Sequence, residues 1–337
     1  FTAFPSRMFV WDLLNSFDKS IQEAYWKKCG FRGITKAVED KIYYLKQMVQ
    51  VKRYFAALDI AALYAKEVPP ELIAEILEKA AIDKSEDEFR IEDYDVERLF
   101  EELYKSDYPK NEIARLEWYY LSFLASVGRD RQSPKMLHNE LSSNPEFFAE
   151  IMKYIYKRKD EKQYEDKEKL PEKLLEQRTK LSVKLLDSWK TIPGSINNND
   201  IKYVTLNSWI ERARELCKKS DRIEVCDIQI GELLAHAEPE NDIWPPESVN
   251  KIIESLDSED IHSGFKIGTI NKRGGYTKAI DEGGEQEAAL AKRFRCYADN
   301  LNTRFPKTAS LLYDVAEDYE NQAKREDNEA EIRDLDH

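Results

Sequence analysis

Residues 265–287, "FKIGTINKRGGYTKAIDEGGEQE", have the composition best suited to binding chemistry in this chain. They hold five of the eleven glycines together with four basic side chains. Adjacent glycines permit backbone conformations that direct N–H groups toward an anion, and nearby cationic groups can neutralise its charge. The basic residues are Lys266, Lys272, Arg273 and Lys278. The order of residues in "NKRGGYTK" does not match a P-loop, so the sequence predicts no nucleotide site of that type.

The same stretch also fits a structural loop that is held by its own ion pairs. The letters "EQE" after Gly283 and Gly284 open a helix, where carboxylates suit the positive end of the helix dipole. These acids can also pair with the basic residues upstream, so we favour a salt-bridged structural loop over a ligand or partner site. Both interpretations concern Lys272, Arg273, Gly274, Glu282, Gly283, Gly284, Gln286 and Glu287.

Motifs for catalysis or metal binding are not found in the sequence. It has no G-x-S-x-G motif and no cysteine with a nearby histidine in a recognisable setting. His138 lies in "MLHNEL", and we expect a hydrogen-bonded core histidine rather than a general base. Residues 257–264, "DSEDIHSG", lack the glycine position and final glutamate of a calcium loop, so we expect a polar turn at a helix end. We predict no catalytic residue, no metal and no cofactor.

Apolar residues recur at helical spacing along most of the chain. Residues 53–66, "RYFAALDIAALYAK", are apolar nearly all round, which predicts a helix that packs on several sides. Asp59 is the only charge inside this helix, and it must be paired or face water. Pro70 is expected near a helix start, and Asn144 is expected to cap a helix that begins at Pro145.

The succession of helices predicts an all-α fold. We expect an irregular α-solenoid of helical hairpins, of the HEAT or TPR kind, although the tetratricopeptide pattern itself is not met. A charged run places a boundary near residue 162, between an N-terminal helical array, 1–162, and a C-terminal helical region, 163–337. The second region is expected to contain a Gly-rich loop at 264–284. It is also expected to end in an antiparallel helical hairpin whose connection includes Pro306.

Composition limits the classes of partner. The net charge is −13, of which −7 lies in residues 314–337, and no clustered positive field suggests a nucleic-acid partner. The most apolar stretch, 113–127, is too short to span a bilayer, so we expect a buried helix there and no membrane partner. The four cysteines lack the spacing of a zinc site or a disulfide framework, which suits reduced thiols in the cytoplasm.

The first residues, "FTAFPSRMFVWDLL", lack an initiator methionine and the features of a secretory signal. We expect the chain to be a piece of a longer protein. Its first helix, within residues 7–29, should then leave apolar side chains exposed where a preceding repeat is missing. The candidates are Phe9, Trp11 and Leu14.

Several motifs together resemble the C-terminal helical region of a group of large, mostly uncharacterised bacterial multidomain proteins. They include "EAYWKKC", "PPELIAEILEKA", "ARLEWYYLSFL", "LLDSWKTIPG", "DEGGEQEAALAKRFRCYA" and "FPKTASLLYDVAEDYE", and the likeness runs through nearly the whole chain. The loop pattern of that group, Asn-x-Arg-Gly followed by Glu-Gly-Gly-x-Gln-Glu, matches Asn271, Arg273, Gly274 and residues 282–287 here. The pattern Trp-Pro-Arg-Thr-Ala becomes "FPKTA" at 305–309, which keeps an aromatic residue and a cation.

The upstream parts of that group resemble signal-transducing, STAND-like NTPases of bacterial antiviral defence. The resemblance implies a non-enzymatic helical array that senses a protein partner or regulates other domains of its parent chain. Stacked hairpins suit such a role because they present an extended surface. The alternative function is a small-ligand or anion-binding module, or an enzyme, built around residues 265–287.

Overall fold

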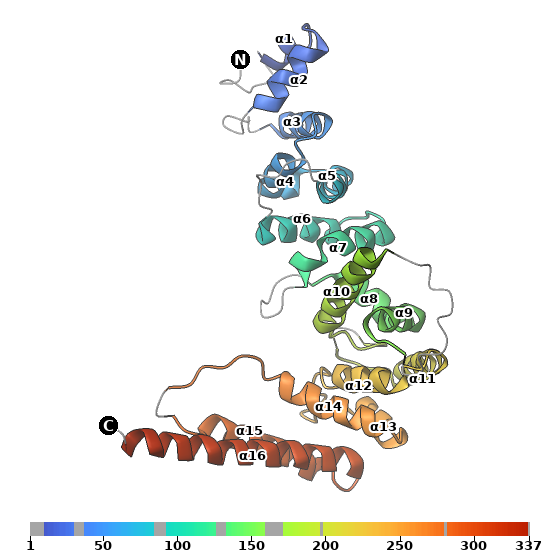
Figure 1. Ribbon diagram of the computed structural model, residues 1–337, viewed down its shortest axis with the longest axis vertical. Helices are drawn as coiled ribbons and strands as arrows, with labels where there is room; N and C mark the ends of the chain where they lie inside the picture. Colours follow the sequence, from blue (N-terminus) through green and yellow to red (C-terminus); the bar gives the residue numbers. More distant parts are fainter. Residues whose placement is uncertain are drawn as a thin grey trace. The chain divides into compact units, whose positions relative to one another are not determined.

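The computed structural model describes residues 10–29, 37–83, 92–125, 133–158, 171–195, 198–279 and 282–335. Across these residues the regular structure is helical and no strand is formed, so the predicted all-α class is confirmed (Figure 1). The helices are α1 (Asp12–Leu14), α2 (Lys19–Lys28), α3 (Val38–Gln50), α4 (Tyr54–Leu63), η2 (Ala65–Glu67), α5 (Pro70–Ile82), α6 (Asp93–Lys105), α7 (Lys110–Leu124), α8 (Lys135–Ser143), α9 (Pro145–Ile155), α10 (Glu172–Ser188), α11 (Tyr203–Lys219), α12 (Ile223–Leu234), α13 (Glu247–Ser255), α14 (Glu259–Asn271), α15 (Glu285–Leu301) and α16 (Pro306–Leu335).

The chain divides into two compact units, Phe1–Leu137 and His138–His337, and the division falls within α8. The boundary predicted near residue 162 lies in the segment 159–170, outside the described residues.

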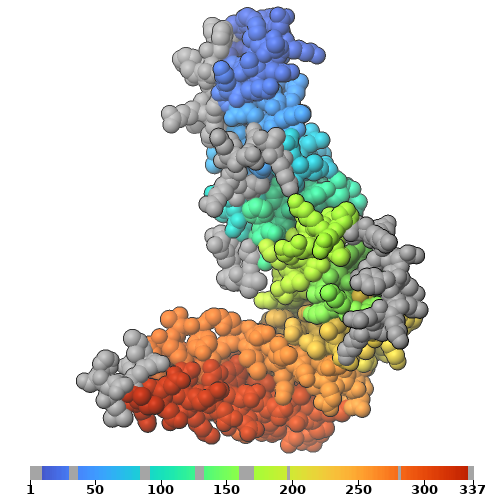
Figure 2. Space-filling view, in the orientation of Figure 1, coloured from blue at the N-terminus to red at the C-terminus, as the bar shows by residue number. Residues whose placement is uncertain are grey.

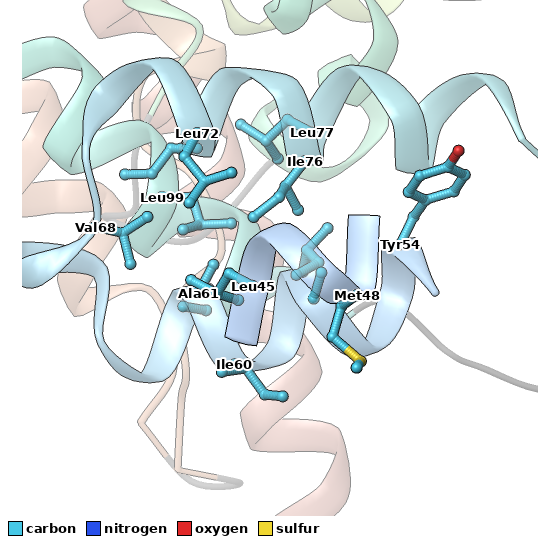
Figure 3. Packing of buried hydrophobic residues seen from close by; sticks show 14 of the residues in the cluster. Leu45, Met48, Tyr54, Ile60, Ala61, Val68, Leu72, Ile76, Leu77 and Leu99 are labelled. Atoms are coloured by element: carbon cyan, nitrogen blue, oxygen red, sulfur yellow. The ribbon is translucent and has the colours of Figure 1, made fainter. Parts of the chain in front are cut away.

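In the first unit, α3 to α7 pack mainly against their neighbours in sequence. α4 contacts α3, α5 and α6, as its nearly all-round apolar sequence predicts. Figure 3 shows side chains from several of these helices meeting in one core, including Leu45, Ala61 and Leu99. Asp59 lies on the exposed side of α4, so the prediction that it is paired or faces water is confirmed.

The expected exposure of Trp11 and Leu14 is wrong, because both side chains are buried. The ring of Trp11 lies 5.4 Å from the ring of Trp26, and its indole N–H donates to the hydroxyl of Tyr25 at 3.1 Å. Aromatic packing and a satisfied N–H both favour burial of the indole. Phe9 lies outside the described residues. The apolar side chains exposed near this end are Leu13, Phe17 and Ile21.

Two predicted helix starts are confirmed, and the segment predicted as a polar turn at a helix end is mostly the first part of a helix. Pro70 is the first residue of α5. The side-chain oxygen of Asn144 accepts hydrogen bonds from the backbone N–H groups of Glu146 and Phe147 at the start of α9. The polar turn expected within 257–264 is the start of α14, where the hydroxyl of Ser258 accepts from a backbone N–H in the first turn.

Glycines set the close approach of α12 and α14 in the second unit. A Cβ added to Gly264 would lie 2.1 Å from the carbonyl oxygen of Ile228, and one added to Gly231 would lie 2.2 Å from the carbonyl oxygen of Ile261. Gly264 and Gly268 therefore serve as helix-packing residues inside α14. The predicted Gly-rich loop, 264–284, begins too early, because glycine here removes side-chain volume and does not turn the chain.

α15 and α16 pack along one another. Arg295 forms a two-pronged ion pair with Glu320 at 2.5 and 2.9 Å, and the hydroxyl of Tyr313 donates to Asp299 at 2.6 Å. Figure 2 shows the residues of both helices in one continuous orange-to-red surface. α16 also contacts α13 and α14, so it closes one side of the second unit.

We predict that Gly264→Ala destabilises the chain by about 2 kcal/mol or more, because the added methyl group meets the backbone of α12. This loss exceeds the gain of about 1 kcal/mol that alanine has over glycine in helix propensity. Urea unfolding followed by circular dichroism measures the difference. The control is Gly275→Ala, where an added Cβ meets nothing within 4 Å. Equal stability of the two variants would contradict the packing role.

A cationic aromatic pocket as the candidate functional site

The second unit contains a pocket of about 860 Å³ at the carboxyl end of α14. This volume lies within the roughly 300–1,000 Å³ range of small-ligand sites. Its walls come from the segment after α12, the end of α14 with the residues that follow, one face of α15 from Gln286 to Tyr297, and one residue of α16. The side chains that carry its chemistry are Trp244, Lys272, Arg273, Tyr276, Gln286, Arg293, Phe294, Tyr297 and Tyr319, with Glu238 as the one acid.

Aromatic rings form the floor of this pocket. Trp244 is fixed by its indole N–H, which donates to the carbonyl of Ala237 at 2.9 Å. Its ring lies 5.7 Å from Tyr297 and 6.0 Å from Phe294, and Phe294 stacks on Tyr319 at 5.7 Å with nearly parallel planes. Trp244, Phe294 and Tyr319 are buried, and Trp244 also stacks on Phe265 at 5.7 Å, so these rings support a rigid wall. Tyr297 is only half-buried and is the ring of this group that a planar ligand can reach.

Two cations of the pocket are incompletely neutralised. The ammonium group of Lys272 lies 5.8 Å from the ring centroid of Trp244, and its nearest carboxylate is Glu238 at 3.9 Å. Burial lowers the pKa of Lys272, Glu238 opposes this effect, and the positive charges of Arg293 and Lys190 add to it. Arg293 is exposed and forms no ion pair with any of the described residues.

Glu287 is the centre of the ion pairs behind the pocket. Its side chain is fully buried, and its oxygens lie 2.7 Å from Nη2 of Arg273 and 2.5 Å from Nζ of Lys278. The contact with Arg273 has the distance of an ion pair but not the alignment of a hydrogen bond. Burial alone would raise the pKa of Glu287, but Lys278 and Arg273 outweigh burial and hold the pKa below its usual value.

The other predicted loop residues shape the turn. The side-chain amide of Gln286 donates to Glu282 at 2.5 Å, and its oxygen accepts from Arg273 at 3.3 Å. Gly274 and Gly283 have φ values of +67° and +62°, which favour glycine. Gly284 donates its backbone N–H to a carboxylate of α16 at 2.7 Å, and an added Cβ there would collide with α16.

The structure therefore brings together the features of both interpretations. Lys272, Arg273 and Gln286 line the pocket, while Glu282 and Glu287 pair within the loop. The acids of α16 were not predicted as partners of the loop, because residues 314–337 indicated only a net negative charge. Glu326 lies 3.5 Å from Lys278, and Asp327 accepts the N–H of Gly284.

Pocket residues outside 265–287 were also missed. They are Trp244, Arg293, Tyr297 and Tyr319. On α15, Phe294 and Tyr297 belong to the apolar stripe, so they resemble core residues. A signal was present: the stripe is rich in large aromatics, and a cation adjoins it at Arg293.

Other residues considered for chemistry have structural roles. His138 is buried, and its Nε2 lies 3.0 Å from the hydroxyl of Ser188, as expected for a core histidine. Cys29, Cys217 and Cys226 are buried, and Cys296 is exposed. The four thiols form no disulfide with one another. Within the described ranges, no three His, Cys, Asp or Glu side chains lie where they could share a metal ion.

Comparison of the chain with protein-family models, with curated proteins and with solved structures found no match. Among the helices of the described residues, none is both long and apolar enough to cross a membrane.

We predict that Glu287→Gln lowers the free energy of unfolding by about 3 kcal/mol at neutral pH, because two partly buried cations lose their shared counter-charge. The folded-state pKa is depressed, so the stabilisation is present above the carboxyl's unfolded pKa of about 4.3 and is lost as pH falls through the lower folded value.

Chemical denaturation at several pH values tests this expectation. The wild type and Glu287→Gln should converge in stability in acid. Glu285→Gln is the matched control, because Glu285 is exposed on the same helix turn. A pH-independent gap between wild type and Glu287→Gln would contradict the ion-pair account.

We predict that burial of His138 makes the chain sensitive to mild acid. Burial lowers the pKa of His138 from 6.5 to about 4, so the unfolded chain binds more protons between these values. Stability is then complete above pH 6.5 and falls as the pH approaches 4. In His138→Gln, the loss of unfolding free energy between pH 7 and pH 5 should be smaller by about 2 kcal/mol. An unchanged pH dependence in denaturation curves would contradict this origin.

Proposed function

We propose that the chain is a non-enzymatic recognition and regulatory region of a larger cytoplasmic bacterial protein. It binds a protein partner or other domains of its parent chain. In this proposal the helices form an irregular α-solenoid of the HEAT or TPR kind that ends in an antiparallel hairpin of α15 and α16. The packing of α3 to α7 against sequential neighbours supports it, because such stacking leaves a repeated surface available for recognition.

A groove between α4 and α6 is the observation that carries this function. It has a volume of about 470 Å³ and lies entirely within the first unit. Its apolar lining includes Ala56, Ile60 and Leu63, and Leu63 and Tyr94 are 48% and 55% exposed. Large apolar side chains exposed beside a groove are typical of a surface that receives another chain.

The charges around the groove are of both signs. Arg53 is already engaged, because it donates to the carbonyl groups of Trp26 and Cys29 at the end of α2. Arg98 lies against the ring of Tyr94, at 5.6 Å. The acids of the groove are Asp59 and Asp95. The groove therefore carries two acids and two arginines, so its charges do not favour one sign of partner. An amphipathic helix whose apolar face covers Leu63 and Tyr94 fits this arrangement.

The resemblance to the C-terminal regions of large bacterial proteins supports the wider role. We propose that the parent is a signal-transducing NTPase of antiviral defence, and that this region senses the trigger or restrains the parent. The alternative function, small-ligand or anion binding around residues 265–287, is favoured by a separate observation. Lys272, Arg273 and Gln286 line a pocket of ligand size.

Affinity capture tests the proposed recognition. The tagged chain is cross-linked in a bacterial lysate, the captured protein is identified, and its purified form is titrated against the chain by calorimetry. Leu63→Asp and Tyr94→Ala should each weaken binding tenfold or more, about 1.4 kcal/mol, because they alter exposed apolar contacts.

The control variant is Ile82→Asp, which places a charge at an exposed apolar position of α5 outside the groove. Its affinity should equal that of the wild type. Equal weakening by Ile82→Asp and Leu63→Asp, or no weakening by either groove variant, would contradict recognition at this groove.

A further inference from the structure

We propose that the pocket of the second unit binds a small anionic ligand that carries a planar ring, of the mononucleotide class. The ring lies against Tyr297, which Trp244 supports from behind, and the anionic group lies between Lys272 and Arg293. This site is separate from the groove of the first unit and does not depend on the proposed protein recognition.

Shape and surface favour a ring-bearing ligand. The pocket has a volume of about 860 Å³, and five of its lining side chains are aromatic. Trp244, Phe294 and Tyr319 hold one another in place, so their positions do not have to be ordered by the ligand. Tyr276 also lines the pocket and is 46% exposed. Stacking on aromatic side chains tolerates different bases, because every base has a π-face.

The sign of the charge distinguishes between two kinds of ligand. An aromatic pocket by itself also suits a quaternary ammonium group. Of the three cations that line the pocket, Arg273 is balanced by Glu287, which leaves two cations against a single acid, Glu238, and this positive excess disfavours a cationic ligand. The cations are Lys272, Arg273 and Arg293. Burial is the main cause of the lowered pKa of Lys272, and the positive charge of Arg293 adds to it, so a bound anion would favour the charged form of Lys272.

The three cations have different roles in the proposed site. Arg273 is held by Glu287, and its guanidinium lies 3.4 Å from the ring centroid of Tyr276, so it shapes the rim and its charge is already balanced. The ammonium group of Lys272 is partly engaged, because it pairs with Glu238 and donates a hydrogen bond to the carbonyl of Ala237. Arg293 is exposed and has no ion pair within the described residues, so it is the group best able to pair with the anion.

Isothermal titration of the full chain with AMP, GMP, CMP and UMP tests the class of ligand. At least one mononucleotide should bind with a Kd below about 1 mM at low salt. Its nucleoside and inorganic phosphate, titrated separately, should each bind at least tenfold more weakly, because each lacks one of the two recognised parts. Absence of binding by all four mononucleotides overturns the proposal. Equal binding of the nucleoside overturns the anionic requirement, and equal binding of phosphate overturns the ring requirement.

Matched charge reversals locate the site. Arg293→Glu should weaken mononucleotide binding tenfold or more, while Arg293→Lys should retain most of it. Lys292→Glu makes the same change in charge at the preceding exposed residue of α15, which does not line the pocket, and should have no more than a twofold effect. Both positions are exposed, so circular dichroism should show folded variants. Equal losses of mononucleotide affinity in Arg293→Glu and Lys292→Glu would show that binding comes from non-specific electrostatic attraction, and would overturn the proposed site.

Discussion

The buried carboxylate of Glu287 is the constraint on which the pocket depends. Its side chain has no contact with solvent, and it pairs with Arg273 and Lys278. An unpaired charge at such a position costs several kcal/mol, so the chain after α14 must close in an arrangement that brings both cations to it. Arg273 lines the pocket, and Lys278 also approaches Glu326 of α16. One carboxylate therefore ties the pocket wall, the turn and the terminal helix together.

The close packing of α12 and α14 supplies the other half of the pocket. Because Gly264 and Gly268 have no side chains, α14 lies against the backbone of α12 and its carboxyl end reaches the segment that follows α12. The carbonyl of Ala237 in that segment accepts hydrogen bonds from both Trp244 and Lys272. The aromatic floor and a principal cation are thus positioned by one backbone group. A wider spacing between the helices would separate them.

Local rules predicted most of the helices, because their signals lie within a few residues. The cap at Asn144 and the start at Pro70 need only neighbouring backbone groups, and the all-round apolar pattern of α4 reports the number of helices around it. The same reasoning failed where a residue acts through a distant partner. Gly264 was taken for a loop residue because its contact is with α12, and the expected exposure of Trp11, which assumed a missing preceding repeat, is wrong because its aromatic partners follow later in the chain.

Only part of the candidate site could be predicted from the sequence, for a related reason. The sequence between 265 and 287 shows which charges are present, but not which of them are neutralised by one another. Structural ion pairs and ligand binding were therefore treated as alternatives, yet the geometry divides the charges between the two. Glu287 forms ion pairs with Arg273 and Lys278 behind the pocket wall. Lys272 lines the pocket together with Arg293. Arg293 lies seven residues after Gln286 on α15, so helical spacing places both on one face, but only the fold brings Lys272 to that face. Charges that are already paired give the pocket its shape, and those that are left in excess determine what it attracts.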